Sequence, residues 1–96
     1  MPNIIAKLDK AFDSRVRLGI MSILLVNESA DFNTMKNLMD LTDGNLASHL
    51  KALEGIEYIR STKQFIGRKP NTKYTVTSLG SKAFKAHIEA LDKLLK

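Results

Sequence analysis

The sequence contains no cysteine and no tryptophan, and aromatic residues make up only 6% of its 96 residues. Without cysteine the chain can form neither disulfides nor thiolate metal sites. Its longest apolar run, residues 23–26, is far too short to span a membrane. Residues 1–12 carry charges among their apolar positions and lack the core and cleavage site of a signal peptide. We therefore expect a soluble cytoplasmic protein, with a hydrophobic content of 44% that supports one compact core.

Acidic residues are missing from a long stretch of the second half, because none occurs between Tyr58 and Ile88. Residues 58–96 hold nine basic and two acidic residues, a net charge of +7, whereas residues 1–57 hold six basic and eight acidic residues, a net charge of −2. A stretch of one sign repels itself unless an anionic partner meets it. A merely solvated surface normally mixes both signs, so the pattern favours binding to a polyanion.

Apolar residues at helical spacing predict five helices. They cover about residues 1–12, 15–26, 33–41, 43–54 and 78–96. Pro2 suits the first turn of the first helix, and Asn33 is placed to cap the third. Phe32 stands alone before that third helix and predicts a strand of one or two residues.

Between the fourth and fifth helices the pattern changes to that of strands. Residues 58–66 and 72–77 are rich in β-branched and aromatic residues, and the Gly-Arg-Lys-Pro-Asn segment at 67–71 has the composition of a turn. This pattern predicts a β-hairpin over residues 58–77 with a basic tip. The expected fold class is mainly α with a small β-hairpin (α+β), in a single domain over residues 1–96.

Residues 33–54 predict a helix-turn-helix, two short helices joined by a tight turn that Thr42 caps. In the second helix, Leu46, Leu50 and Leu53 define the face that points inward. A rotation of about 100° per residue along the helix then places five residues outward. These outward residues are Gly44, Asn45, Ser48, Lys51 and Ala52. None is acidic, whereas a plain amphipathic surface helix usually mixes Glu and Lys. Small and hydrogen-bonding side chains let a helix approach the major-groove floor and reach base edges or phosphates.

The hairpin adds a second basic element to this helix-turn-helix. An arginine at the end of a narrow β-ribbon suits the negative potential of the minor groove, and the strand cations can follow the phosphates. A solubilising turn has no need of five cations and no anion. The candidate DNA-binding residues are Asp43, Gly44, Asn45, Ser48, His49, Lys51, Arg60, Lys63, Arg68, Lys69, Asn71 and Lys73.

Three segments together resemble compact single-domain winged helix-turn-helix regulators related to the MarR and ArsR groups. They are RLGIMSILL at 17–25, DLTDGNLASHLKALE at 40–54 and GRKPNTKYTVTSLG at 67–80. The resemblance covers residue 13 to the end of the sequence, and it implies a DNA-binding dimer with a recognition helix at 43–54 and a wing at 58–77. Ala47 stands where such proteins often carry Ser. Glu57 stands where they usually carry Gly, which leaves two alternatives: a left-handed backbone at Glu57, or a helix that ends earlier at Gly55.

The two histidines do not form a predicted site of chemistry. His49 lies at the edge of the inward face and resembles the histidine of the ArsR-type His-Leu pair, which favours a buttressing role over base contact. His87 lies on the apolar stripe of the last helix. Neither has carboxylates at coordinating spacing, so no metal site is expected. No nucleophile elbow, phosphate-binding glycine loop or paired carboxylates occur, so we expect neither an enzyme nor a cofactor.

The terminal segments 1–12 and 78–96 lie outside the DNA-reading unit and are expected to be dimerisation helices. Their apolar stripes are wider than one short segment needs, although the two helices could instead cover each other within one chain. The candidate interface residues are Ile4, Ile5, Leu8, Phe12, Phe84, His87, Ile88, Leu91, Leu94 and Leu95.

The functional hypothesis is a sequence-specific regulator that binds double-stranded DNA as a homodimer. Repression is favoured because 96 residues leave no room for a separate activation domain. The alternative is a winged-helix module for protein interaction without DNA binding. An effector pocket between protomers is compatible with the first hypothesis, but nothing in the sequence indicates a small-molecule effector.

Overall fold

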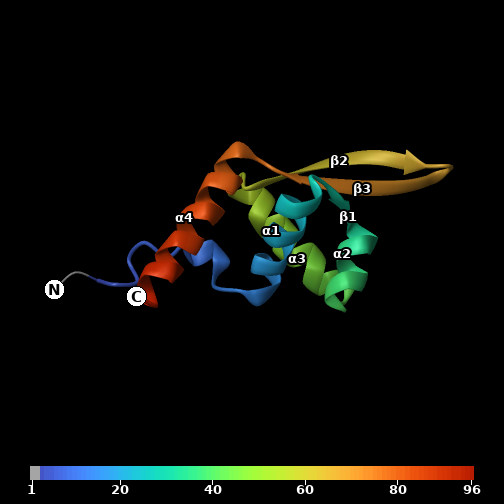
Figure 1. Cartoon of the computed structure of the whole chain (residues 1–96). Coiled ribbons are helices and arrows are strands. Elements are labelled where there is room, and N and C mark those ends of the chain that lie inside the picture. The colour runs from blue at the N-terminus through green and yellow to red at the C-terminus, as the bar shows by residue number, and fades with distance from the viewer. Residues whose placement is uncertain (1–2) are drawn as a thin grey trace.

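The computed structural model describes residues 3–96, and these form four α-helices and one three-stranded antiparallel sheet (Figure 1). In chain order the elements are α1 (Arg15–Asn27), β1 (Ala30–Asp31), α2 (Phe32–Met39), α3 (Asp43–Gly55), β2 (Ile59–Ile66), β3 (Lys69–Val76) and α4 (Ser78–Leu94). The expected α+β class, mainly helical with a β-hairpin, is confirmed.

Each α-helix begins at a residue whose side-chain oxygen accepts a backbone N–H of the first turn. Ser14 caps α1, Thr42 caps α3 and Thr77 caps α4. The prediction that Asn33 caps α2 is wrong, because Asp31 does so and accepts the backbone N–H of Thr34 at 2.7 Å. A two-residue strand is present at Ala30–Asp31, but the prediction that Phe32 forms it is wrong, because Phe32 is the first residue of α2 after the Asp31 cap.

One core joins the helices to the sheet. The inward leucines predicted for α3, at positions 46, 50 and 53, are all buried. They meet Ile20, Met21 and Leu24 of α1, while the sheet contributes Ile59 and Tyr74. The helical spacing therefore predicts the inward face of α3 correctly, and the outward face of this helix is left to solvent.

The hairpin of β2 and β3, called the wing below, extends well beyond this core (Figure 1). Pairing runs from Ile59 opposite Val76 to Ile66 opposite Lys69, which leaves a turn of only two residues, Gly67 and Arg68. Gly67 adopts the positive φ of 64° that the first position of a type II′ turn requires. The turn is thus shorter than the predicted 67–71, because residues 69–71 already belong to β3. The molecule measures 58 × 25 × 22 Å, with the wing tip at one end and the C-terminal end of α4 near the other.

The predicted helix over residues 1–12 is wrong. Residues 4–8 form turns and a bend, and only Lys10–Phe12 form a short 3-10 helix. Asp9 is the cause, because its extended backbone interrupts the helix while its carboxylate accepts the N–H of Ala11 and its own N–H donates to His87 Nδ1. The expected role of Pro2 lies outside the described residues.

Candidate nucleic-acid interface

Helix α3 presents a face free of acidic side chains over most of its length. Thr42 Oγ1 accepts the N–H of Asn45 at 3.2 Å and thereby fixes the start of the helix. Of the five residues predicted outward, Gly44, Asn45, Ser48 and Lys51 are exposed, and Ala52 is half-buried. This surface offers one glycine, one amide, one hydroxyl and one cation, and its polar groups can hydrogen-bond to base edges and phosphates.

The one acidic candidate on α3, Asp43, has a cation of its own. Lys36 Nζ of α2 lies 2.8 Å from Asp43 Oδ1, and both side chains remain accessible. Asp43 also stands in the first turn of α3, where a carboxylate is favoured by the helix dipole. Its charge therefore stabilises the start of the helix, and the ion pair reduces its repulsion of an approaching polyanion.

The wing carries five cations with no acidic residue on either strand. Arg60, Lys69 and Lys73 occupy one face, because they stand opposite Thr75, Ile66 and Thr62 in the pairing of the two strands. Lys63 lies on the opposite face and Arg68 lies in the turn itself. All but Lys73 are exposed. The basic charge thus follows the wing out to its tip.

Asn71 has a structural task that the sequence did not indicate. Its Oδ1 accepts from Gln64 Nε2 at 2.8 Å, and its Nδ2 donates to Asp31 Oδ2 at 3.2 Å. Hydrogen bonds from Thr34 and, to a smaller extent, from Asn71 lower the pKa of Asp31, which stays charged. The Asn71 amide thus ties the wing to the cap of α2, and the DNA contact expected of this residue stays a prediction.

His49 lies between α3 and α1, in agreement with the expected buttressing position. Its Nδ1 accepts from Arg17 Nε at 3.1 Å, and both side chains are partly exposed. Burial and the nearby charge of Arg17 lower the pKa of His49, so the ring is neutral at pH 7. Arg17 was missed in the sequence because it is 32 residues from His49 and no local pattern connects the two.

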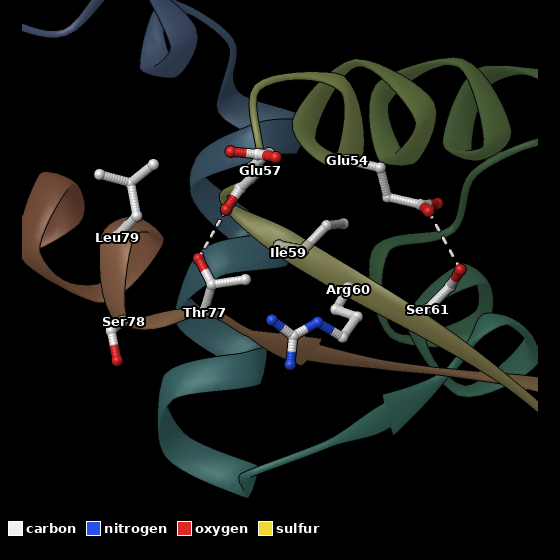
Figure 2. A pocket seen from close by; sticks show the side chains of 8 residues that line it. All are labelled: Glu54, Glu57, Ile59, Arg60, Ser61, Thr77, Ser78 and Leu79. Carbon is white, nitrogen blue, oxygen red and sulfur yellow. Dashed lines mark hydrogen bonds between the residues drawn. The ribbon is translucent and has the colours of Figure 1, made fainter.

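A polar cleft opens at the base of the wing (Figure 2). Glu54 accepts from Ser61 at 3.0 Å on one side, and Thr77 Oγ1 donates to the carbonyl oxygen of Glu57 at 2.6 Å on the other. Arg60 lies between these two pairs. Both alternatives left open for Glu57 hold together: α3 ends at Gly55, and Glu57 has a left-handed backbone with φ of 64°.

The comparisons with known proteins agree with this geometry. The profile of the family described as "Winged helix DNA-binding domain" matches residues 16–95. The chain belongs to this family. The predicted resemblance to winged helix regulators is thereby confirmed at the level of the family.

Two proteins of similar sequence cover almost the whole chain. An uncharacterized protein of Methanocaldococcus jannaschii is 38% identical over 87 residues, which is 91% of this chain and 95% of that protein. The transcriptional regulator homologue of Pyrococcus horikoshii OT3 is 32% identical with a TM-score of 0.84, over 96% of this chain and 89% of that one. The DNA-bound structure of reduced AbfR is 20% identical with a TM-score of 0.75, over 94% of this chain and 64% of that one, and it shows the same fold.

The ends of this winged helix chain meet along α4. Phe12 packs against Tyr58, Phe84 and His87, with ring centroids 5.2–5.5 Å apart. Tyr58 OH donates to Asp9 Oδ2 at 2.6 Å, which raises the pKa of Tyr58 to about 12 together with burial and the charge of Asp9. The N-terminal segment is thus bound to its own chain by aromatic packing and by hydrogen bonds.

This packing corrects part of the predicted dimer interface. Phe12, Phe84 and His87 are only 2%, 9% and 4% exposed within a single chain, so a partner cannot reach them. Leu8 is half-buried. The other predicted interface residues remain exposed: Ile4, Ile5, Ile88, Leu91, Leu94 and Leu95. The terminal segments therefore cover each other only in part, and an apolar surface remains at this end of the molecule.

Metal-ligand clusters and membrane-spanning helices are both absent from the described residues. Within residues 3–96, no three His, Asp or Glu side chains gather as metal ligands. No helix in this part of the chain is long and apolar enough to cross a bilayer.

Proposed function

We propose that the chain is a transcriptional regulator that binds double-stranded DNA sequence-specifically as a homodimer, with α3 in the major groove and the wing at the minor groove. One observation carries the proposal: the same winged helix has a small, polar, exposed face on α3 and a wing with five cations and no acidic residue. A relative with 32% identity is described as a transcriptional regulator homologue, and the DNA-bound AbfR structure shows the same fold in a complex.

The salt dependence of duplex binding tests the DNA contact. Removing one phosphate contact should flatten the log–log salt slope by about 0.9. Replacing Arg68 and Lys69 by Ala should weaken binding to every duplex and reduce the slope. The matched control replaces Lys82 and Lys85, two exposed lysines of α4, and removes the same charge without touching the wing. Equal effects of the two pairs would show only a general charge effect. If the unmodified protein shows no salt-sensitive retention on immobilised duplex, the protein-interaction alternative is favoured.

The dimer is proposed from the apolar surface at the chain ends. Ile4 is 75% exposed and Leu95 is 87% exposed, and such a patch on a small domain marks an interface. A two-fold dimer formed there would hold two recognition helices about 34 Å apart, the spacing of successive major grooves.

Sedimentation tests this assembly. Ile88 and Leu91 replaced together by Glu should give a monomer with greatly reduced DNA affinity. Val26→Glu, which changes an apolar residue that is 80% exposed on α1, is the control and should leave the dimer intact. A single species of monomer mass for the unmodified protein at micromolar concentration would contradict the dimer.

Repression is the finer part of the proposal. A regulator bound within a promoter blocks polymerase by occupancy, which needs only the DNA contact described above. Transcription in vitro should fall as the protein is added, if the promoter contains a binding site that the protein has selected from random DNA. A rise would show activation instead.

A further inference from the structure

The hydrogen bond from Arg17 to His49 fixes which groups the two side chains present to the outside. Because Nδ1 of His49 accepts from Arg17 Nε, the neutral ring carries its proton on Nε2 and can only donate there. The guanidinium has used one of its five N–H groups in this bond, and the four on its terminal nitrogens remain. The pair therefore presents hydrogen-bond donors alone.

No anion within the described chain neutralises Arg17. The two salt bridges among residues 3–96 join other pairs, one between Lys36 and Asp43 and one between Lys96 and Asp92. Asp9 lines the same surface depression as Arg17, but its carboxylate oxygens already accept from the N–H of Ala11 and from Tyr58 OH. A partly desolvated guanidinium without a carboxylate partner suits an anion that comes from outside.

The pair stands on one flank of the recognition helix. At about 100° per residue, His49 shares a side of α3 with Asn45 and Ala52, and Arg17 lines a depression together with Ala52. Glu54 lies on the other side of α3, where it accepts from Ser61 at the base of the wing. The outward residues, centred on Ser48, lie between these two flanks.

A helix in the major groove has a phosphate backbone along each side. The basic wing follows one flank of α3. We propose that Arg17 and His49 form a phosphate-binding site on the other flank, in which the terminal N–H groups of Arg17 and Nε2–H of His49 donate to one DNA phosphate. This inference rests on the proposed DNA binding, and it makes Arg17 a contact residue and His49 both a contact and the group that orients Arg17. A planar guanidinium suits the phosphate, since its fork can donate two parallel hydrogen bonds.

Two variants of Arg17 separate the charge from the geometry. Arg17→Gln should weaken binding to selected and random duplexes alike, by roughly tenfold, because it removes the charge-assisted contact of the guanidinium with the DNA phosphate. Its salt slope should fall by about 0.9 per protomer. Arg17→Lys should restore the slope but only part of the affinity, because lysine has no Nε to fix the histidine. Lys82→Gln on α4 is the charge-matched control and should change neither. An unchanged slope in a folded Arg17→Gln protein would overturn the proposal.

A scan with single methylphosphonate linkages in the selected duplex needs no protein variant. For the unmodified protein, neutral linkages should weaken binding on both flanks of each half-site. A neutral linkage on the flank away from the wing should weaken binding of the unmodified protein about tenfold. The same linkage should have little further effect on the affinity of Arg17→Gln. If neutral linkages weaken binding on the wing flank alone, the phosphate site is overturned and the DNA-binding proposal still stands. This result comes from the unmodified protein, so it holds even if Arg17→Gln fails to fold. Failure of the unmodified protein to bind any duplex would contradict the proposed function itself.

Discussion

Gly80→Ala should destabilise the fold strongly, because Gly80 lies where the first turn of α4 passes against the backbone of Tyr58. A Cβ at this position would overlap the carbonyl oxygen of Tyr58 and lie 2.8 Å from its carbonyl carbon. The carbonyl oxygen cannot easily move, because it accepts the N–H of Thr77 at 3.0 Å, while the N–H of Tyr58 donates to Leu53. The added methyl group therefore meets backbone held from both sides.

The expected magnitude follows from two opposing effects. Overpacking typically costs about 1–3 kcal/mol, and rigid backbone as the neighbour places this site at the upper end. The better helix propensity of alanine offsets at most about 1 kcal/mol. We expect a net decrease of about 2 kcal/mol in the free energy of unfolding. For a domain of this size the Tm would fall by roughly 8–16 °C.

Thermal unfolding followed by far-ultraviolet circular dichroism measures the effect. Gly44→Ala is the matched control, because no atom lies within 4 Å of a Cβ built at this helical glycine. The Tm of Gly44→Ala should stay the same or rise, because its added methyl group faces the proposed DNA and not the rest of the chain. An unchanged Tm for Gly80→Ala would show that α4 is not seated on Tyr58 as described.

Three further outcomes follow from the same structure. Because the pKa of His49 is lowered in the folded protein, the unfolded chain takes up a proton at a higher pH than the folded one. The free energy of unfolding should therefore be highest above about pH 6.5 and decline as the pH falls below it. His49→Gln should flatten this pH dependence in denaturant titrations. The raised pKa of Tyr58 means that this residue should ionise near pH 12 in an absorbance titration, with stability declining as the pH rises above 10, and Asp9→Asn should bring this ionisation back toward 10. Asn45→Ala should cost about 1–3 kcal/mol of binding on the selected site and much less on random duplex, and an equal cost on both would mean a phosphate contact only.

Features that depend on local sequence could be predicted. The inward leucines of α3 follow from helical spacing, and Thr42 identifies the start of that helix because a threonine hydroxyl is a good N-cap. The strand pattern around Gly67 likewise predicts the wing and its basic tip. The exposed recognition face is the complement of the inward line and needs no further information.

Features that depend on tertiary contacts could not be predicted. The pairing of Arg17 with His49 brings together side chains that no local pattern relates. The first segment has good helical spacing, yet Asp9 is drawn into contact with His87 and Tyr58, and these bonds exclude a helix there. The apolar stripe of α4 was predicted as one surface, whereas Phe12 covers Phe84 and His87 in its middle and leaves the residues from Ile88 onward exposed.

The most direct test of the central claim is a methylation-interference and footprinting experiment on a duplex selected from random DNA by the unmodified protein. We predict two symmetric half-sites whose major-groove contacts are centred about 10 bp apart, each flanked by minor-groove protection from a wing. Failure to select any sequence, or contacts confined to a single half-site without major-groove interference, would contradict a dimer that reads DNA through α3.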